Sequence, residues 1–268
     1  MMAPGKREER CPRCGLPRSE WSENVEGYAR IEHLYSRGDC ADAIRGAVDQ
    51  ARSHPASRAP PCLRVPVRFI LLGVGAMNSP RYAPAGLLVE HGDIRVMIDG
   101  GPGAEPPGTI DAWLVTDDRG ELTRQIRQLA GARGLTPQVA RFRRDGLVIS
   151  PEPVVHTSHP TYGYLIAAEG RKVVWAPEFL EFPRWAEGAD VMFAEAAGWN
   201  RPIRFARGAG GHAAALQVAR EAREHGVRKL VFAHIGRPTI KALDAGLRPP
   251  FGEIGHDGAV FTVTGSPP

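Results

Sequence analysis

The chain has 268 residues, of which 43% are hydrophobic and 24% are charged, and its formal net charge at pH 7 is +4. This composition is typical of a globular protein with one large domain and room for a small appendage. No apolar run is long enough to span a membrane, and the charged start MMAPGKREER lacks the apolar stretch of a secretory signal. These features exclude a membrane-spanning helix and favour a soluble cytoplasmic protein, and the spread-out positive charge gives mild support for an anionic partner.

Residues 1–62 are predicted to form a small N-terminal module that ends in a proline-rich linker. Cys11 and Cys14 form a C-x₂-C knuckle, the spacing at which two thiolates can occupy two corners of a zinc tetrahedron. The sequence has no second knuckle, so a structural zinc ion and free thiols in a vestigial site both stay open. The other candidate ligands in this module are His33, Cys40 and Cys62.

Residues 63–268 are predicted to form the main domain, in which apolar strands alternate with amphipathic helices. A first strand (VPVRFILLGVG) leads to a hairpin about His91-Gly92-Asp93 and to a strand that ends at Thr116. The further predicted elements are a helix at Leu122–Ala132, a strand at Leu147–Val155, a hairpin of Tyr162–Ala168 and Lys172–Ala176, a strand at Ala189–Glu195, a helix from about His212 to His225, and strands at Lys229–His234 and Ala259–Val263. This alternation predicts an α/β (α+β) fold, a four-layer αββα sandwich of two mixed sheets with helices outside.

Polar side chains fall at the ends of the predicted strands, where a rigid sheet fixes the backbone and the loops let side chains converge. A hairpin brings the outer ends of its strands together, so His156 and Glu178 are expected to meet. His234 ends a later strand, and His212 opens the helix that precedes that strand. Such histidines and carboxylates are candidates for metal binding and proton transfer. The other histidines of interest are expected at the surface or in turns: His54, His91, His159 and His225.

Several stretches of residues 65–263 carry a family resemblance in their order and spacing. They are FILLGVGAMNSPRYAPAGLLVE, MIDGGPG, IDAWLVT, VVHTSHPTYGYLI, KVVWAPE, GGHAAALQVAREA, KLVFAHI and GEIGHDGAVF. In these stretches the chain resembles proteins of the metallo-β-lactamase fold, in the branch that contains ribonuclease Z and the phosphoribosyl cyclic-phosphate phosphodiesterases.

The resemblance implies a set of roles. In that branch an H-x-H-x-D-H loop, a His before the hairpin, an Asp after it and a His at the end of a late strand hold two metal ions, commonly zinc. It implies that His156, Glu178 and His234 bind metal, that the metals activate the attacking water, and that His212 protonates the leaving oxygen. It also implies that Asp99 is structural and accepts hydrogen bonds from loop amides beneath the site.

The metal-binding loop departs from the family pattern. Its six positions read Asp117-Asp118-Arg119-Gly120-Glu121-Leu122, so all three histidines are missing and Glu121 is the carboxylate that remains. Leu122 cannot bind a metal, and Arg119 places a permanent cation where an imidazole is expected. An ordinary dizinc centre is therefore not expected.

Three interpretations of this altered loop stay open. In the first, one metal ion persists on some of Glu121, His156, Glu178, His234 and Asp117, a set that suits manganese or iron as well as zinc. In the second, Arg119 replaces a metal by pairing with Asp117 or Glu178, and the pocket binds an anion without hydrolysing it. In the third, these residues are ordinary polar groups at strand ends.

The leading functional prediction is metal-dependent hydrolysis of a phosphodiester or a related small anionic ester at a single-metal site. The candidate catalytic residues are His212, Arg119 and Asp117, and nucleic acid and a second copy of this chain are further candidate partners. The alternative is a catalytically inactive binding or regulatory protein on the same fold. A role like that of the pyrroloquinoline-quinone biosynthesis B protein is also open, because Thr116-Asp117 and Ala176-Pro177 resemble segments of its relatives.

Overall fold

The computed structural model describes residues 65–206 and 209–265. The predicted N-terminal module lies outside these residues, together with Cys11, Cys14 and the predicted domain boundary at residue 63. No helix in the described part of the chain is long and apolar enough to cross a membrane.

The first sheet has five strands in the order β14-β1-β2-β3-β4, and its pairs are antiparallel except for β3 with β4. These strands are β1 (Val67–Gly73), β2 (Gly86–His91), β3 (Ile94–Asp99), β4 (Ala112–Leu114) and β14 (Val260–Val263). Buried and more exposed residues alternate along β1 because successive side chains of a strand point to opposite faces of the sheet.

The second sheet has seven strands in the order β13-β12-β9-β8-β7-β6-β5. The strands β8, β9, β12 and β13 run parallel, and β5 to β8 form an antiparallel meander. The bounds are β5 (Phe142–Arg144), β6 (Leu147–Val154), β7 (Thr161–Ala168), β8 (Arg171–Ala176), β9 (Val191–Ala196), β12 (Leu230–Ile235) and β13 (Glu253–Ile254). A separate two-stranded ribbon consists of β10 (Ile203–Arg204) and β11 (Gly211–His212), and a 3₁₀ turn spans Arg184–Ala186.

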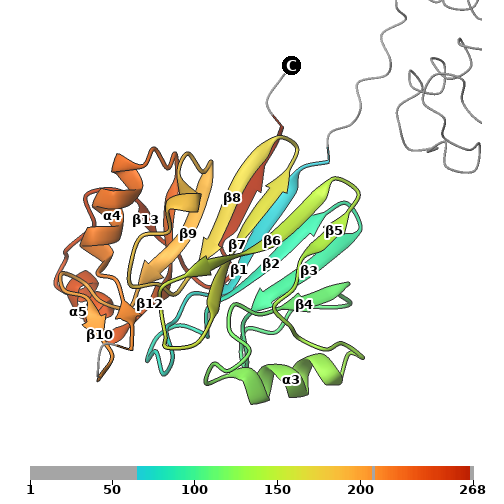
Figure 1. Ribbon diagram of the computed structural model, residues 1–268, viewed down its shortest axis with the longest axis horizontal. Coiled ribbons are helices and arrows are strands. Elements are labelled where there is room, and N and C mark those ends of the chain that lie inside the picture. Colours follow the sequence, from blue (N-terminus) through green and yellow to red (C-terminus); the bar gives the residue numbers. More distant parts are fainter. Residues whose placement is uncertain (1–64, 207–208, 266–268) are drawn as a thin grey trace, which may run out of the picture. The chain divides into compact units, whose positions relative to one another are not determined.

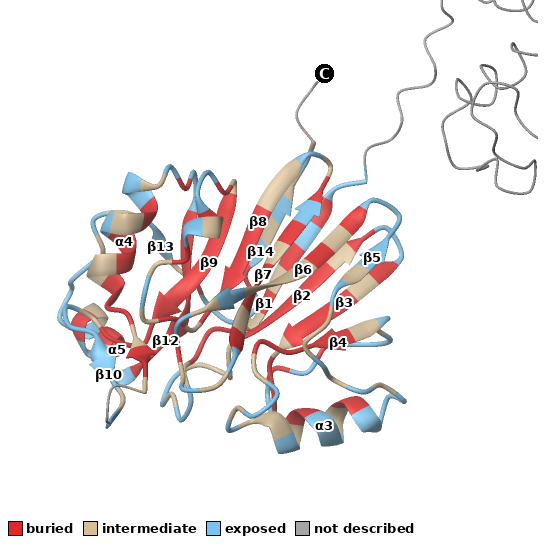
Figure 2. Cartoon of the chain, in the orientation of Figure 1, coloured by how far each residue is buried: buried red, intermediate tan, exposed pale blue. Residues whose placement is uncertain are grey.

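The two sheets pack face to face over one hydrophobic core. Phe193 of β9 contacts Phe69 of β1 and Phe261 of β14, with ring centroids 6.1 and 5.2 Å apart, so aromatic rings from both sheets interdigitate. The strands β2, β3, β9 and β12 are buried over most of their length, whereas the helices keep an exposed side (Figure 2).

Within residues 65–265, three α-helices cover the outer faces of the sheets. In α3 (Thr123–Gly131), Ile126 and Ala130 pack on a second apolar cluster that includes Trp113 of the first sheet. The helices α4 (Ala215–Glu224) and α5 (Arg237–Asp244) lie together beside β9 and β12, away from α3 (Figure 1). This arrangement of helix, sheet, sheet and helix layers confirms the predicted αββα sandwich.

The predicted helix from His212 is wrong at its start. α4 begins at Ala215, because Gly211 and His212 instead pair with Arg204 and Ile203 in the ribbon of β10 and β11. His212 therefore lies on a short strand that runs past the strand ends, and α4 starts three residues later. Sequence periodicity also missed α5 and the short strands β5 and β13.

The ribbon is possible because two glycines approach other backbone segments. Gly210 and Gly211 have φ angles of 119° and 153°, and a Cβ on Gly210 would collide with the carbonyl oxygen of His156.

We expect Gly210→Ala to lower the free energy of unfolding by about 1–3 kcal/mol, through backbone strain and displacement of His156. Denaturant titration measures this. Gly131→Ala is the matched control, because its added Cβ meets nothing within 4 Å, and an equal loss in the two variants would contradict the argument.

Candidate functional site

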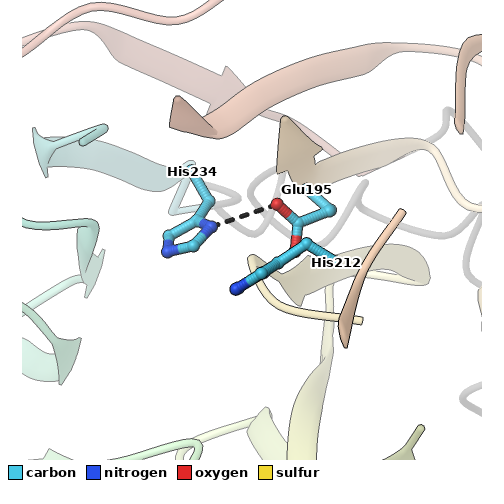
Figure 3. A group of neighbouring side chains, drawn as sticks. All are labelled: Glu195, His212 and His234. Atoms are coloured by element: carbon cyan, nitrogen blue, oxygen red, sulfur yellow. Dashed lines mark hydrogen bonds and ion pairs between the residues drawn. The ribbon is translucent and has the colours of Figure 1, made fainter. Parts of the chain in front are cut away.

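The site is organised around Glu195, whose side chain is completely buried in the described structure. Its Oε2 lies 2.8 Å from Nδ1 of His212, and its Oε1 lies 3.1 Å from Nδ1 of His234 (Figure 3). The same carboxylate accepts hydrogen bonds from the backbone N–H groups of Ala197 and Phe179, at 2.7 and 3.2 Å. Each imidazole is thus held through Nδ1, and its Nε2 points away from Glu195.

These residues meet because parallel strands end at one edge of the sheet. β9 and β12 pair in a register that sets Glu195 opposite His234, beside an irregularity in β12. β8 runs parallel to β9, and Glu178 follows the end of β8 by two residues. The carboxyl ends of neighbouring parallel strands are a usual place for a ligand site, because loops there can converge on a fixed frame.

Glu178 lies between two histidines, and one of them is His156, the partner that the hairpin predicted. Its Oε1 is 3.0 Å from Nε2 of His234, and its Oε2 is 3.5 Å from Nε2 of His156. Nδ1 of His156 lies 3.0 Å from the carbonyl oxygen of Gly211, so that carbonyl accepts a hydrogen bond from Nδ1–H and presents Nε2 to Glu178. The structure therefore brings together His156, Glu178, His212 and His234, and adds Glu195.

Opposite charges shift the pKa values of this network. Burial by itself would raise the pKa of Glu178 and Glu195, but the neighbouring histidines, His234 first, outweigh it and lower both to about 2. Burial would lower the pKa of His234, yet Glu195 and Glu178 outweigh it and raise this pKa to about 10. Without a bound cation, the site holds a protonated His234 between two carboxylates.

A pocket of about 460 Å³ opens over these groups and is lined by His156, Glu178, His212 and His234. Phe205 lines it as well and meets His156 and His212 with its ring edge-on, at centroid distances of 5.4 and 5.3 Å. An aromatic wall of this kind keeps water from one side of the imidazoles.

The altered loop contributes Asp117 to the pocket wall. The side chain of Arg119 forms no ion pair there with Asp117 or Glu178. Both carboxylate oxygens of Asp117 contact Nε2 of His159, at 2.9 and 3.0 Å. The side chain of Arg119 is 69% exposed, and within the described residues its one carboxylate neighbour is Asp118, at 3.9 Å. The pairing of Arg119 with Asp117 or Glu178, on which the second interpretation depends, is therefore not formed.

The last two loop positions differ in what they touch. Glu121 is exposed and lines the pocket, whereas Leu122 packs against the apolar cluster under α3. Asp99 lies beneath the loop at a φ angle of 55° and accepts hydrogen bonds from the amide and hydroxyl of Thr116 and from the indole of Trp175. The predicted scaffolding contact of Asp99 with a loop amide is confirmed.

Two residues of the site were missed by sequence reasoning. Glu195 was counted as the end of a strand, although a charged residue at the end of an otherwise apolar strand was a usable signal. His159 was expected at the surface or in a turn, but its side chain is 24% exposed and is bonded to Asp117, 42 residues away in sequence. His91 is also buried, with 7% of its surface exposed, and no local pattern indicated this.

The donor groups do not fit two metal ions. Leu122 offers no ligand atom, Arg119 is a cation, and Asp117 is engaged by His159. One ion fits better. Glu195, His212 and His234 each place a ligand atom within 4.8 Å of the others, the one such set of three in the described residues, and Glu178 and His156 lie beside it.

Comparison with known proteins identifies the fold. No protein-family model matches the sequence, and no curated protein sequence matches it. The metallo-β-lactamase fold protein YhfI from Bacillus subtilis superimposes with a TM-score of 0.57 and 16% identity, over 74% of this chain and all (100%) of its own. A diphosphatase from the PhnP family gives 0.55 and 16%, over 75% and 98%. Zn²⁺-bound PqqB from Methylobacterium extorquens gives 0.55 and 13%, over 72% and 99%.

At these identities the likeness establishes architecture and not activity. The part of the chain that the structure describes has the metallo-β-lactamase fold, as its sequence stretches predicted.

Proposed function

We propose that this protein is a metal-dependent hydrolase of a phosphodiester or a related anionic ester, with one metal ion in the main site. The observation that carries the proposal is the double hydrogen bond of buried Glu195 to His212 and His234, which leaves both Nε2 atoms on the side of the 460 Å³ pocket. Buried carboxylates that fix histidine tautomers in this way are typical outer supports of metal and proton-transfer sites.

His156, Glu178 and His234 would hold the ion from the pocket side, where Glu178 contacts Nε2 of both histidines. Glu195 belongs to the close set with His212 and His234 and would orient these two imidazoles from behind. Glu195 accepts hydrogen bonds from Nδ1 of both imidazoles, at 2.8 and 3.1 Å, so these two nitrogens are occupied and the Nε2 atoms are left for other roles. Two imidazoles with a carboxylate suit zinc, manganese or iron. When bound, a divalent ion would act as a Lewis acid on a substrate oxygen and stabilise the developing negative charge.

His212 is the group that we assign to the leaving oxygen. Glu195 accepts a hydrogen bond from Nδ1–H of His212, so Nε2 is the ring atom on the pocket side, and it can donate a proton when the imidazole is doubly protonated. Phe205 packs edge-on against this ring and fixes its orientation. A proton delivered from Nε2 would neutralise the alkoxide as the ester bond breaks.

The pocket mouth suits an anionic substrate. Arg119 and Arg237 both line it, both are exposed, and their contacts with protein acceptors are long, 3.9 Å to Asp118 and 3.5 Å to the carbonyl oxygen of Asn78. Guanidinium groups with such weak partners are available to a phosphate or carboxylate. The neighbours named as a diphosphatase and as a Zn²⁺-bound protein support this substrate class and the metal, and they do so through the shared fold alone.

The test is the metal content of variants in a Cys11→Ser/Cys14→Ser background, which removes the predicted N-terminal zinc knuckle from the count. We expect about one equivalent of zinc, manganese or iron in this background, and a loss of most of it in Glu178→Ala and His234→Ala. Hydrolysis of bis(p-nitrophenyl) phosphate should fall with the metal.

Glu181→Ala and His256→Ala are the matched controls, because both side chains are exposed and outside the pocket lining. A protein that takes up no metal, either as purified or after reconstitution, would rule out the metal-dependent reaction. That result would favour the non-catalytic binding protein instead.

A further inference from the structure

A further imidazole–carboxylate pair, His159 with Asp117, lines the pocket, and the proposed function gives this pair no role. Nε2 of His159 lies 2.9 and 3.0 Å from the two oxygens of Asp117. The side chains are 24% and 10% exposed, so the pair is largely shielded and still open on one side. Both residues line the pocket that holds His212.

The pair is held in place by contacts between two loops. Asp117 follows Thr116, whose carbonyl oxygen accepts the N–H of Tyr162 at 2.9 Å, and this bond ties the loop after β4 to the start of β7. The Arg119 N–H donates to Asp117 at 2.7 Å, and the Thr157 hydroxyl donates to the carbonyl oxygen of His159 at 2.9 Å. Each partner is thus oriented by its own backbone neighbours.

The geometry fixes which ring nitrogen is free. Asp117 is an acceptor, so the hydrogen on His159 lies on Nε2, and Nδ1 carries the lone pair. Nδ1 has no hydrogen-bond partner among the residues that the structure describes. A carboxylate that holds one imidazole nitrogen and leaves the other as an acceptor makes that imidazole a base, as in hydrolase triads.

Hydrolysis needs such a base. The attacking water must lose a proton, and the proposed reaction assigns His212 only to the leaving oxygen. In the family pattern, metal ions held partly by the loop histidines activate the water, and Asp117 stands at the first of those positions. The proposed reaction therefore has a proton donor for the leaving oxygen, but no residue has yet been assigned to accept the proton of the attacking water.

We propose that His159, oriented by Asp117, is the general base for the attacking water. As the water oxygen forms its bond to phosphorus, Nδ1 of His159 takes the water proton. His212 starts this step as the imidazolium: as the bond from phosphorus to the leaving oxygen breaks, it gives that oxygen the proton on Nε2 and keeps the proton on Nδ1 that Glu195 accepts. The products are a phosphate monoester and an alcohol, and the proton on His159 returns through solvent to His212. This assignment rests on the proposed hydrolase function.

The kinetic test compares His159→Gln with His212→Gln on a series of aryl methyl phosphodiesters whose leaving groups differ in acidity. We expect His159→Gln to lower kcat by about 10²–10⁴-fold, by a similar factor for every leaving group. The loss in His212→Gln should grow as the leaving group becomes a poorer one. The acidic limb of the pH profile of kcat should disappear in His159→Gln, and added imidazole should partly restore His159→Ala.

The controls separate a base from a structural residue. Metal content should stay at the wild-type value in His159→Gln, and His256→Gln, an exposed histidine outside the pocket lining, should keep wild-type kcat and KM. A loss confined to KM, or a loss that grows with poorer leaving groups as it does for His212→Gln, would overturn the assignment.

A second measurement does not depend on turnover. Long-range ¹H–¹⁵N correlation spectra of the metal-loaded full chain report the tautomer of each histidine, and His159→Gln identifies the signal. We expect His159 to be protonated at Nε2 and not at Nδ1, and Asp117→Asn to change this. A wild-type His159 protonated at Nδ1 would overturn the inference even if the protein hydrolyses diesters. Absence of all hydrolysis together with the expected tautomer would count against the proposed function instead.

Discussion

Replacing Glu195 with glutamine is expected to damage both the fold and the site, although the two side chains have nearly the same shape. All four groups that contact this carboxylate are donors, namely two backbone amides and two imidazole Nδ1–H groups. A glutamine amide would turn its own NH₂ towards two of them. We expect the free energy of unfolding to fall by about 3–5 kcal/mol, the cost of breaking a buried charged network from one side.

The same change should weaken metal binding and turnover, because His212 and His234 would lose the group that fixes their tautomers. We expect metal affinity to fall by about 10–100-fold. Denaturant titration and metal titration check the two effects. Glu181→Gln is the control, since that glutamate is exposed. A Glu195→Gln protein within 1 kcal/mol of wild type would show that the network is less tightly coupled than its distances indicate.

The stability of the metal-free protein should depend on pH in a defined way. The pKa values of Glu178 and Glu195 fall from 4.5 to about 2 on folding, so their contribution is present above pH 4.5 and is lost as the pH falls through 2. The pKa of His234 rises from 6.5 to about 10, so its contribution is complete below pH 6.5 and is lost as the pH rises through 10. Together, these three groups stabilise the folded protein most between pH 4.5 and 6.5.

Folding raises the pKa of Asp99, whereas it lowers the pKa values of Glu178 and Glu195. Burial raises its pKa from 3.8 to about 6, against the hydrogen bonds from Trp175 and Thr116, so its ionisation costs stability as the pH rises through this interval. The stability optimum of the metal-free protein is therefore expected near the lower end of the interval, close to pH 4.5. Each titrating group contributes a slope of at most about 1.4 kcal/mol per pH unit.

Thermal denaturation in EDTA across a pH series measures this profile. His234→Asn should flatten the decline above pH 6.5, and Asp99→Asn should flatten the decline below pH 6. Added zinc or manganese should raise the melting temperature more at pH 8 than at pH 5, because the metal must displace the proton of His234. A wild-type profile that stays level from pH 6.5 to 10 in EDTA would contradict the ion pairs of His234.

Patterns of apolar residues and turn residues predicted those strands and hairpins whose formation depends on neighbouring residues in the sequence. The hairpin of β7 and β8 was predictable because apolar runs flank a short turn, and the meeting of His156 and Glu178 follows from hairpin geometry. Glu195 was not predicted, because its position opposite His234 depends on the register of two parallel strands far apart in sequence. No periodicity encodes that register.

The loops were the least predictable part of the site. The contact between Asp117 and His159 joins segments 42 residues apart and arises from two loops that are tied by one backbone bond. The start of α4 was misplaced for a similar reason, because the ribbon through His212 depends on close backbone approach at Gly211. Helical periodicity depends on the pattern of apolar side chains, so it does not detect a close approach of two backbone segments.

The packing of Leu122 makes the altered loop difficult to convert into a metal-binding loop. This side chain is anchored in the cluster under α3, so a histidine there would trade cohesion of the domain for a ligand with too few companions. A second metal ion would need replacements at Asp117 and Arg119 in addition to Leu122, so a change at Leu122 alone gives up apolar packing without completing a ligand set. Chemistry that uses residues outside this loop motif avoids that loss.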